Sequence, residues 1–285
     1  MLWVTTAGGG TSRFSLDRQW FSHIRYNPNL EIGLPHPSVR SILPGNDPSI
    51  LIATDQGLAC WITTRGEGLI RYHPDEGTEY YYHEAENSNS LGHDNVSVTL
   101  SNDDRTYIGT LGAGLWIHEA QRDELRRIPN PPGSDMNFVT TLSLDTKENL
   151  WVAAQSNVFL LKSGDKELTS FSEAFPQAEP LTSAFITTIL PDRNGIVWLG
   201  TLHSGLDRFN TVTGEIVNFN SAFNGLPDDE VKGLIKDDNG FLWVVTHAGV
   251  ARLDAMQNGF RVFSAEDGLQ RSGFQRGAVT RSNDG

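Results

Sequence analysis

Short apolar runs separated by turn-forming residues extend along the whole chain. In residues 185–219, for example, the runs FITTIL, VWLGT, GLDRF and EIVNF are separated by segments rich in Gly, Asp and Asn. Val, Ile, Thr and Phe dominate these runs, and such residues between turn formers predict β-strands. Apolar residues nowhere recur at helical spacing over roughly eleven positions, so we expect an all-β fold.

One phrase recurs about every 45 residues, a period typical of propeller blades or helical repeats. It reads LWVTTAGGG, CWITTRGEG, TYIGTLGAG, LWVAAQSNV, VWLGTLHSG and LWVVTHAGV, with its aromatic residue at Trp3, Trp61, Tyr107, Trp151, Trp198 and Trp243. Each unit holds four expected strands, so we predict a β-propeller of six four-stranded blades. The aromatic residues are expected to pack between neighbouring blades, which would bury both faces of each sheet.

Two regions decide how such a ring is completed. SILIATDQGL (49–58) repeats the phrase just before CWITT, so we expect an insertion there, and the strand register in 44–64 stays open. The chain ends with GAVTRSNDG and begins with MLWVTT, and the joined segments match DDNGFLWVVT. We therefore expect strand 277–284 to lie beside strand 2–6 and to close the ring without a free edge.

The turns carry a second regularity. Gly195 and Gly240 close the first turn of their units, where a positive φ is expected, and Gly205 opens a third strand after a tight bend. The fourth unit departs from this pattern, with Glu148 in place of the turn glycine and alanines at 153–154 in place of Gly-Thr.

The net charge and the cysteine content exclude several classes of partner and site. The formal net charge of −13 repels phosphate backbones and anionic membrane surfaces, so we expect no nucleic acid partner and no direct membrane contact. Cys60 is the single cysteine, which excludes an intramolecular disulfide and a cysteine-based metal site, and its apolar neighbours favour packing. No cofactor is expected. No apolar stretch reaches the roughly 18 residues of a membrane helix, and the N-terminus lacks a signal-peptide pattern.

The phrase D-x-x-G-x-L-W-I-G-T-x-x-G-L-x-R-Y resembles the two-component regulator propeller repeat. The segments at 72–96 and 263–285 are similar to the linkers of that family. The resemblance implies a periplasmic sensor region of a bacterial hybrid histidine kinase or of a diguanylate cyclase. It also implies that residues 1–285 are a single propeller cut from a longer protein, without signal peptide, transmembrane segment or kinase module. The parent would have seven blades, a neighbouring propeller or β-sandwich, and a homodimeric state.

Propeller topology places candidate binding residues on one face. The loops between second and third strands share this face with the segments that lead into first strands, while the D-x-x-G turns lie opposite. A rim of guanidinium, imidazole, amide and carboxylate groups with an aromatic ring suits a polyhydroxylated or acidic sugar. The candidate ligand-binding residues are Arg65, Glu67, Gln155, His203, His247, Phe274 and Arg276; His93, Asp94, Asn95, Asp228, Asp229 and Gln275 share the face.

Three functions follow from these patterns. The leading one is a non-catalytic sensing and interaction propeller for a small-molecule or oligosaccharide ligand, and the ligand class comes from the resemblance. The second is a propeller enzyme: Asp238, Gly240 and Trp243 resemble the Asp-box turn of sialidases, and His203 or His247 would be the base of a lyase. His203 and His247 also have equivalent loop positions, but two histidines are a weak metal signal. The third is a pure scaffold.

Overall fold

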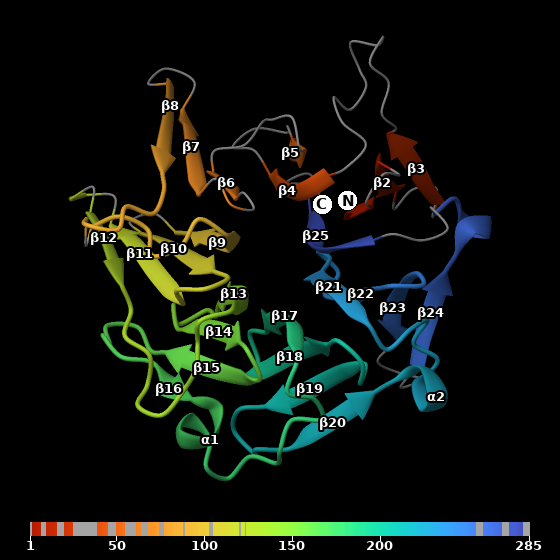
Figure 1. Cartoon of the computed structure of the whole chain (residues 1–285). Helices are drawn as coiled ribbons and strands as arrows, with labels where there is room; N and C mark the ends of the chain where they lie inside the picture. Colours follow the sequence, from red (N-terminus) through yellow and green to blue (C-terminus); the bar gives the residue numbers. More distant parts are fainter. Residues whose placement is uncertain are drawn as a thin grey trace. The chain divides into compact units, whose positions relative to one another are not determined.

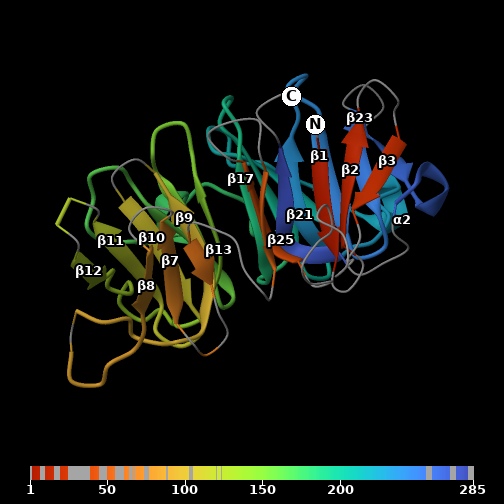
Figure 2. The same cartoon turned by 90° about the horizontal axis from the view of Figure 1, so that it is seen from above.

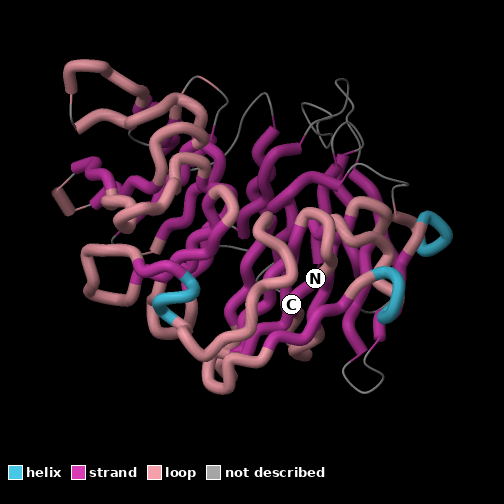
Figure 3. Tube along the Cα trace, turned by 60° about the horizontal axis from the view of Figure 1, so that its bottom comes forward, coloured by secondary structure: helices cyan, strands magenta, loops and turns pink. Residues whose placement is uncertain are grey.

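The computed structural model describes residues 2–6, 10–15, 20–24, 39–44, 50–54, 61–63, 66, 68–73, 77–87, 89–102, 105–119, 121–122, 124–254, 259–269 and 274–281. These residues form five four-stranded antiparallel sheets, one three-stranded sheet and one two-stranded sheet. Among them, helix is confined to single turns at α1 (Phe171–Ala174), α2 (Ser221–Asn224) and the 3-10 turn η1 (Ala265–Asp267), as Figure 3 shows. The all-β prediction is confirmed.

The chain forms two compact units. Unit 1 comprises Met1–Ala59, Gly200–Asp207 and Asn218–Gly285, and unit 2 comprises Cys60–Leu199 and Arg208–Val217. The sheet of β17 (Ile186–Pro191), β18 (Ile196–Thr201), β19 (Leu206–Asn210) and β20 (Ile216–Phe219) has residues in both. Its four strands follow the runs expected from the sequence to within one residue at each end, because Gly, Asp and Asn limit them there.

Unit 2 contains three further sheets. They are β6 (Trp61–Thr63), β7 (Leu69–His73) and β8 (Gly77–Tyr81); β9 (Val96–Ser101), β10 (Arg105–Thr110), β11 (Leu115–Glu119) and β12 (Glu124–Arg127); and β13 (Val139–Leu144), β14 (Leu150–Ala154), β15 (Asn157–Leu161) and β16 (Thr169–Ser170). The first strands β9, β13 and β17 lie side by side in this order (Figure 1). Neighbouring first strands of successive sheets are the arrangement expected of propeller blades.

Unit 1 brings the two ends of the chain together. It holds β21 (Val231–Lys236), β22 (Leu242–Thr246), β23 (Val250–Asp254) and β24 (Gly259–Phe263), and a second sheet in the order β25 (Phe274–Arg281), β1 (Leu2–Thr6), β2 (Gly10–Ser15) and β3 (Trp20–Ile24). β25 pairs antiparallel with β1, with Leu2 opposite Arg281 and Val4 opposite Val279. Figure 2 shows the two strands adjacent. The expected pairing of the two terminal strands is thus observed.

The region 44–64 contributes to two different sheets. β4 (Val39–Pro44) pairs with β5 (Ile50–Thr54), whereas β6 belongs to the sheet of β7 and β8. Both copies of the repeated phrase are therefore strands, and the described residues form seven sheets. The predicted count of six blades is not confirmed, and closure of the ring stays a prediction.

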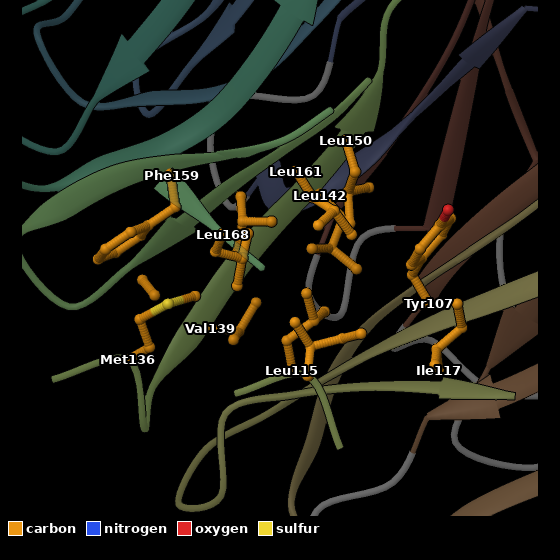
Figure 4. Close-up of a cluster of buried hydrophobic side chains, with 13 residues drawn as sticks. Tyr107, Leu115, Ile117, Met136, Val139, Leu142, Leu150, Phe159, Leu161 and Leu168 are labelled. Atoms are coloured by element: carbon orange, nitrogen blue, oxygen red, sulfur yellow. The ribbon is translucent and has the colours of Figure 1, made fainter. Parts of the chain in front are cut away.

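Four aromatic residues of the repeat, Tyr107, Trp151, Trp198 and Trp243, are buried; the side chains of Trp3 and Trp61 lie outside the described residues. Tyr107 is 4% exposed, Trp151 2% and Trp243 1%. Tyr107 shares a cluster with Leu115, Val139 and Leu150 that fills the space between the β9–β12 and β13–β16 sheets (Figure 4). Burial of each such ring contributes roughly 2–3 kcal/mol, so the repeat retains a large ring at this place.

The irregular fourth unit keeps the turn of the others. Glu148, which stands where other units have glycine, adopts a φ of 61°, and the turn closes because Asp145 Oδ1 accepts hydrogen bonds from the backbone amides of Lys147 and Asn149 at 2.8 and 2.9 Å. Gly205, by contrast, is sterically required: its φ is 76°, and an added Cβ would lie 2.2 Å from the carbonyl oxygen of Phe219.

Candidate functional site

A buried threonine fixes the loop between the second and third strands in three of the sheets. Thr110, Thr201 and Thr246 are 0% exposed. Their hydroxyls donate to the carbonyl oxygens of Gly114, Gly205 and Gly249 at 2.9, 2.8 and 2.9 Å, and accept from the backbone amides of Ala113, Ser204 and Gly249. This pair of hydrogen bonds explains why threonine and glycine recur at the two ends of these loops, because it holds the residues between them in one conformation.

These loops are joined to the segments that lead into first strands. The amide of Gly205 donates to Asp229 O at 3.0 Å, the amide of His247 donates to Glu230 O at 2.9 Å, and the amide of Gln155 donates to Phe138 O at 2.9 Å. The two loop types therefore lie on the same side of their sheets, as the topology predicted.

The polar centre of unit 1 is the carboxylate of Glu230, just before β21. Lys232 Nζ hydrogen-bonds Glu230 Oε1, and Arg276 Nη2 of β25 lies 4.0 Å from the same oxygen. His247 Nδ1, in the loop after β22, lies 3.6 Å from Glu230 Oε2. We call these four residues the Glu230 cluster. Two predicted residues, His247 and Arg276, are thus brought together by an acid that the sequence analysis did not name.

A β-bulge places Lys232 in this cluster. The register of β21 against β22 shifts between Val231 and Gly233, which leaves Lys232 as the extra residue. The same shift makes Ser97 the extra residue of β9 and Thr140 that of β13. Ser97 Oγ donates to Val139 O at 2.6 Å, and Thr140 Oγ1 donates to Ile186 O at 3.1 Å, so both reach the next first strand. Because bulges redirect side chains, the longer Lys232 can reach Glu230 from this position.

Positive charge controls the ionisation of Glu230. Partial burial raises its pKa, but the hydrogen bond from Lys232 and the charges of Lys232, His247 and Arg276 outweigh that effect. The pKa of Glu230 is therefore lowered from its ordinary value, and the carboxylate is ionised at neutral pH.

Two other predicted residues have different placements. Phe274 is 3% exposed and packs in a cluster with Trp243, Leu269 and Phe263, so its ring is not available to stack on a ligand. His203 is exposed, but it stands two residues after Thr201, whereas His247 directly follows Thr246. The hydrogen bonds of their backbone amides group His247 with Gln155 rather than with His203. The predicted equivalence of the two histidines therefore does not hold.

Gln155 lies in unit 2 in a strained conformation. Its φ is 54°, which costs a non-glycine residue free energy, and its Nε2 donates to Asp135 Oδ2 at 3.0 Å. Strain of this kind is retained where the fold or a binding site requires it. Arg65 and Glu67 lie outside the described residues.

Two exposed aromatic residues of unit 2, Phe138 and Phe185, lie directly before first strands. The side chain of Phe138, whose carbonyl oxygen accepts the hydrogen bond from the backbone amide of Gln155, is 47% exposed. Phe185 is 54% exposed. Each immediately precedes a first strand, β13 or β17, and these two strands are neighbours. The sequence analysis missed both rings, although their common place directly before a first strand is a signal that an alignment of the units contains.

The described part of the chain offers little to a metal ion. Within it, no group of three or more His, Cys, Asp or Glu side chains is arranged to hold one. The described residues also include no helix that is long and apolar enough to cross a membrane.

Comparison with known sequences finds a family match in two segments of the chain. Residues 180–203 and 225–248 match the model of the two component regulator propeller. The chain contains two-component regulator propeller repeats. Glu230, Lys232 and His247 lie inside the second matched repeat. Histidine kinase P4 of Formosa agariphila is 26% identical over 174 residues, which are 59% of this chain and 13% of that protein.

Solved structures share the fold of these repeats. Extracellular domains of two proteins assigned as hybrid two-component systems of B. thetaiotaomicron match with TM-scores of 0.61 and 0.55, at 18% and 17% identity, over 97% and 90% of this chain. The chain spans 37% and 41% of their lengths. A catalytically inactive virginiamycin B lyase from Staphylococcus aureus matches with a TM-score of 0.52 at 11% identity, over 79% of this chain and 69% of that chain. Extracellular domains of two-component systems and a lyase thus share this fold.

Proposed function

We propose that this chain is a non-catalytic, ligand-sensing region of an extracytoplasmic two-component sensor and that its ligand is an oligosaccharide. The observation that carries the proposal is the Glu230 cluster, which lies in loops held by buried threonines within a matched sensor repeat. A sensor needs a rigid polar site that binds and releases its ligand unchanged. The extracellular location of the similar two-component domains supports an extracytoplasmic, periplasmic place.

The side chains of the site suit sugar hydroxyls. A carboxylate accepts hydrogen bonds from hydroxyl groups, while guanidinium, ammonium and imidazole groups donate to their oxygens. Unit 2 has a separate candidate sugar contact, because the exposed rings of Phe138 and Phe185 offer apolar faces on which a pyranose ring can stack. In a two-component sensor, the ligand acts by favouring one arrangement of the protein over another through differential affinity. Neighbouring propeller or β-sandwich domains and a second protomer are the proposed partners that read this change.

One observation favours a second candidate, a propeller lyase. His247 Nδ1 lies 3.6 Å from Glu230 Oε2, which resembles a general base oriented by a carboxylate, and a lyase shares the fold. Glu230, however, also pairs with Lys232 and Arg276, so its charge is directed mainly at fixed cations. Catalysis would appear as consumption of a substrate that His247→Ala abolishes. A diguanylate cyclase with the same propeller would bind the same ligand. The output domain is therefore identified from the sequence of the parent protein and not from ligand binding.

The proposal is tested by thermal shift with a panel of defined oligosaccharide fragments. We expect at least one fragment to raise the melting temperature of the wild-type protein. For a neutral fragment, Glu230→Gln should lose about tenfold in affinity, since a charged acceptor for sugar hydroxyl groups is removed. Glu266→Gln, an exposed acid on η1 in the same unit, is the matched control and should bind normally. If no fragment shifts the melting temperature, the sugar-sensing proposal is wrong.

A further inference from the structure

We propose that Arg276, His247 and Lys232 form a subsite for an oxyanion, the carboxylate or sulfate ester of an acidic sugar. This inference rests on the proposed function and deepens it, because it names the class of oligosaccharide. It starts from the charges of the Glu230 cluster, where one carboxylate faces three basic side chains.

Two of the three basic groups have hydrogen-bond donors to spare. Arg276 Nη2 lies 4.0 Å from Glu230 Oε1 and His247 Nδ1 lies 3.6 Å from Oε2, and both distances exceed the usual 2.7–3.2 Å of an N–H···O bond. Their side chains are 41% and 55% exposed. Among the described residues, Glu230 is the acid within ion-pair reach of Arg276. A ligand oxygen that enters between these groups therefore finds donors that the protein leaves unused.

The other acids nearby are occupied by the backbone. Asp228 Oδ1 accepts the amide of Glu230 at 2.7 Å. Asp229 Oδ1 accepts the amide of Ser221 at 2.7 Å, and its Oδ2 accepts the Ser221 hydroxyl at 3.1 Å. Within the described ranges, neither aspartate forms an ion pair with the three bases. Among the described residues, Glu230 is thus the acid that pairs with both Lys232 and Arg276. A bound oxyanion would supply a second negative charge.

The position of Lys232 argues for a purpose beyond folding. In β9 and β13 the bulge residue is a hydroxyl that bonds to the next first strand. In β21 the bulge carries an ammonium on a side chain that is only 15% exposed, which is costly unless the charge has partners. The ion pair of Lys232 and Glu230 lies beside the exposed guanidinium of Arg276. The planar, forked arrangement of guanidinium donors matches both carboxylate and sulfate oxygens.

The inference is tested by calorimetric titration with matched pairs of oligosaccharides. The uronate arm uses oligogalacturonate and oligoalginate with their carboxyl-reduced forms, and the sulfate arm uses carrageenan oligosaccharides with their desulfated forms. We expect an acidic member to bind about tenfold or more tightly than its neutral counterpart. The arm that shows the preference identifies the oxyanion.

Variants separate this subsite from the rest of the surface. Arg276→Gln and His247→Gln should remove most of the preference for the acidic member, whereas Arg261→Gln, whose guanidinium lies over the ring of Phe263 in the same unit, should keep it. If neutral members bind as tightly as acidic ones, the oxyanion subsite is wrong and sugar sensing stands. If neither acidic nor neutral members bind, both proposals fall.

Discussion

The indole Nε1 of Trp243 donates a hydrogen bond to Asp237 Oδ2 at 2.8 Å. Asp237 Oδ1 accepts the backbone amides of Asn239 and Phe241 at 3.0 and 2.9 Å, so one carboxylate closes the turn and fixes the ring that fills the core. In this unit, one aspartate therefore stabilises both the turn and the buried tryptophan ring. Asp237 has this role, and not Asp238, which the sequence motif had suggested.

The first prediction concerns this carboxylate. Asp237→Ala should lower the free energy of unfolding by about 1–3 kcal/mol, because the partly buried indole of Trp243 and two turn amides lose their acceptor. Asp238→Ala, at the exposed neighbouring position, should change it by less than about 0.5 kcal/mol. Urea unfolding of both variants measures the difference, and equal losses would show that the bond to Trp243 has no special weight.

The buried threonine of the loop that carries His247 can be tested without a change in volume. Thr246→Val removes the hydroxyl that bonds Gly249 and should cost about 1–3 kcal/mol of unfolding free energy. Thr246→Ser keeps the hydroxyl and should lose less, although it removes a methyl group. If serine is the worse substitution, packing and not the hydrogen bonds holds this loop. Chemical denaturation of the two variants provides the comparison.

Acid should weaken the contribution of Glu230 to stability. Its pKa is lowered in the folded protein, so its stabilising effect is complete above the ordinary carboxyl value of 4.5 and is lost as the pH falls through the lowered value. The difference in unfolding free energy between wild type and Glu230→Gln should thus be largest near neutral pH and should shrink below pH 4.5. A difference that stays constant down to about pH 3 would contradict the ion-pair account.

Phe138 and Phe185 are predicted to form a sugar contact on unit 2, separate from the Glu230 cluster of unit 1. Phe138→Ala and Phe185→Ala should each weaken oligosaccharide binding about three- to tenfold, the loss expected for one stacking contact. Both rings are about half exposed, so stability should change little. Phe223→Ala on α2, with a side chain that is 87% exposed, is the matched control and should bind as the wild type does. Equal binding by all three variants would exclude the rings from the site.

Local pattern predicted most strands but not every partner. The runs of β17 to β20 are recognisable because turn residues limit them on both sides. ILIAT and WIT both fit the repeated phrase, and the choice between them depends on pairing with β4 or β7, which a local pattern does not contain. Both segments are strands, and they belong to two different sheets, so the predicted count of six blades is not confirmed.

The candidate site was predicted only in part, for a similar reason. The loop positions of His247 and Arg276 follow from topology, whereas the role of Lys232 arises from a bulge whose register is set by β22. Phe274 was misjudged because an aromatic residue beside a loop has the same sequence whether its ring faces the core or the solvent. Glu230 was overlooked beside Asp228 and Asp229, whose carboxylates accept backbone amides instead.

The most direct test of a non-catalytic sensor is to follow one ligand through binding and recovery. The oligosaccharide with the largest thermal shift is incubated with excess wild-type protein and then with catalytic amounts, and all sugar species are quantified by mass spectrometry. The account predicts saturable binding with complete recovery of the intact ligand, and weaker binding by Arg276→Gln. Multiple turnovers to shorter or unsaturated products, abolished by His247→Ala, would contradict it and establish an enzyme.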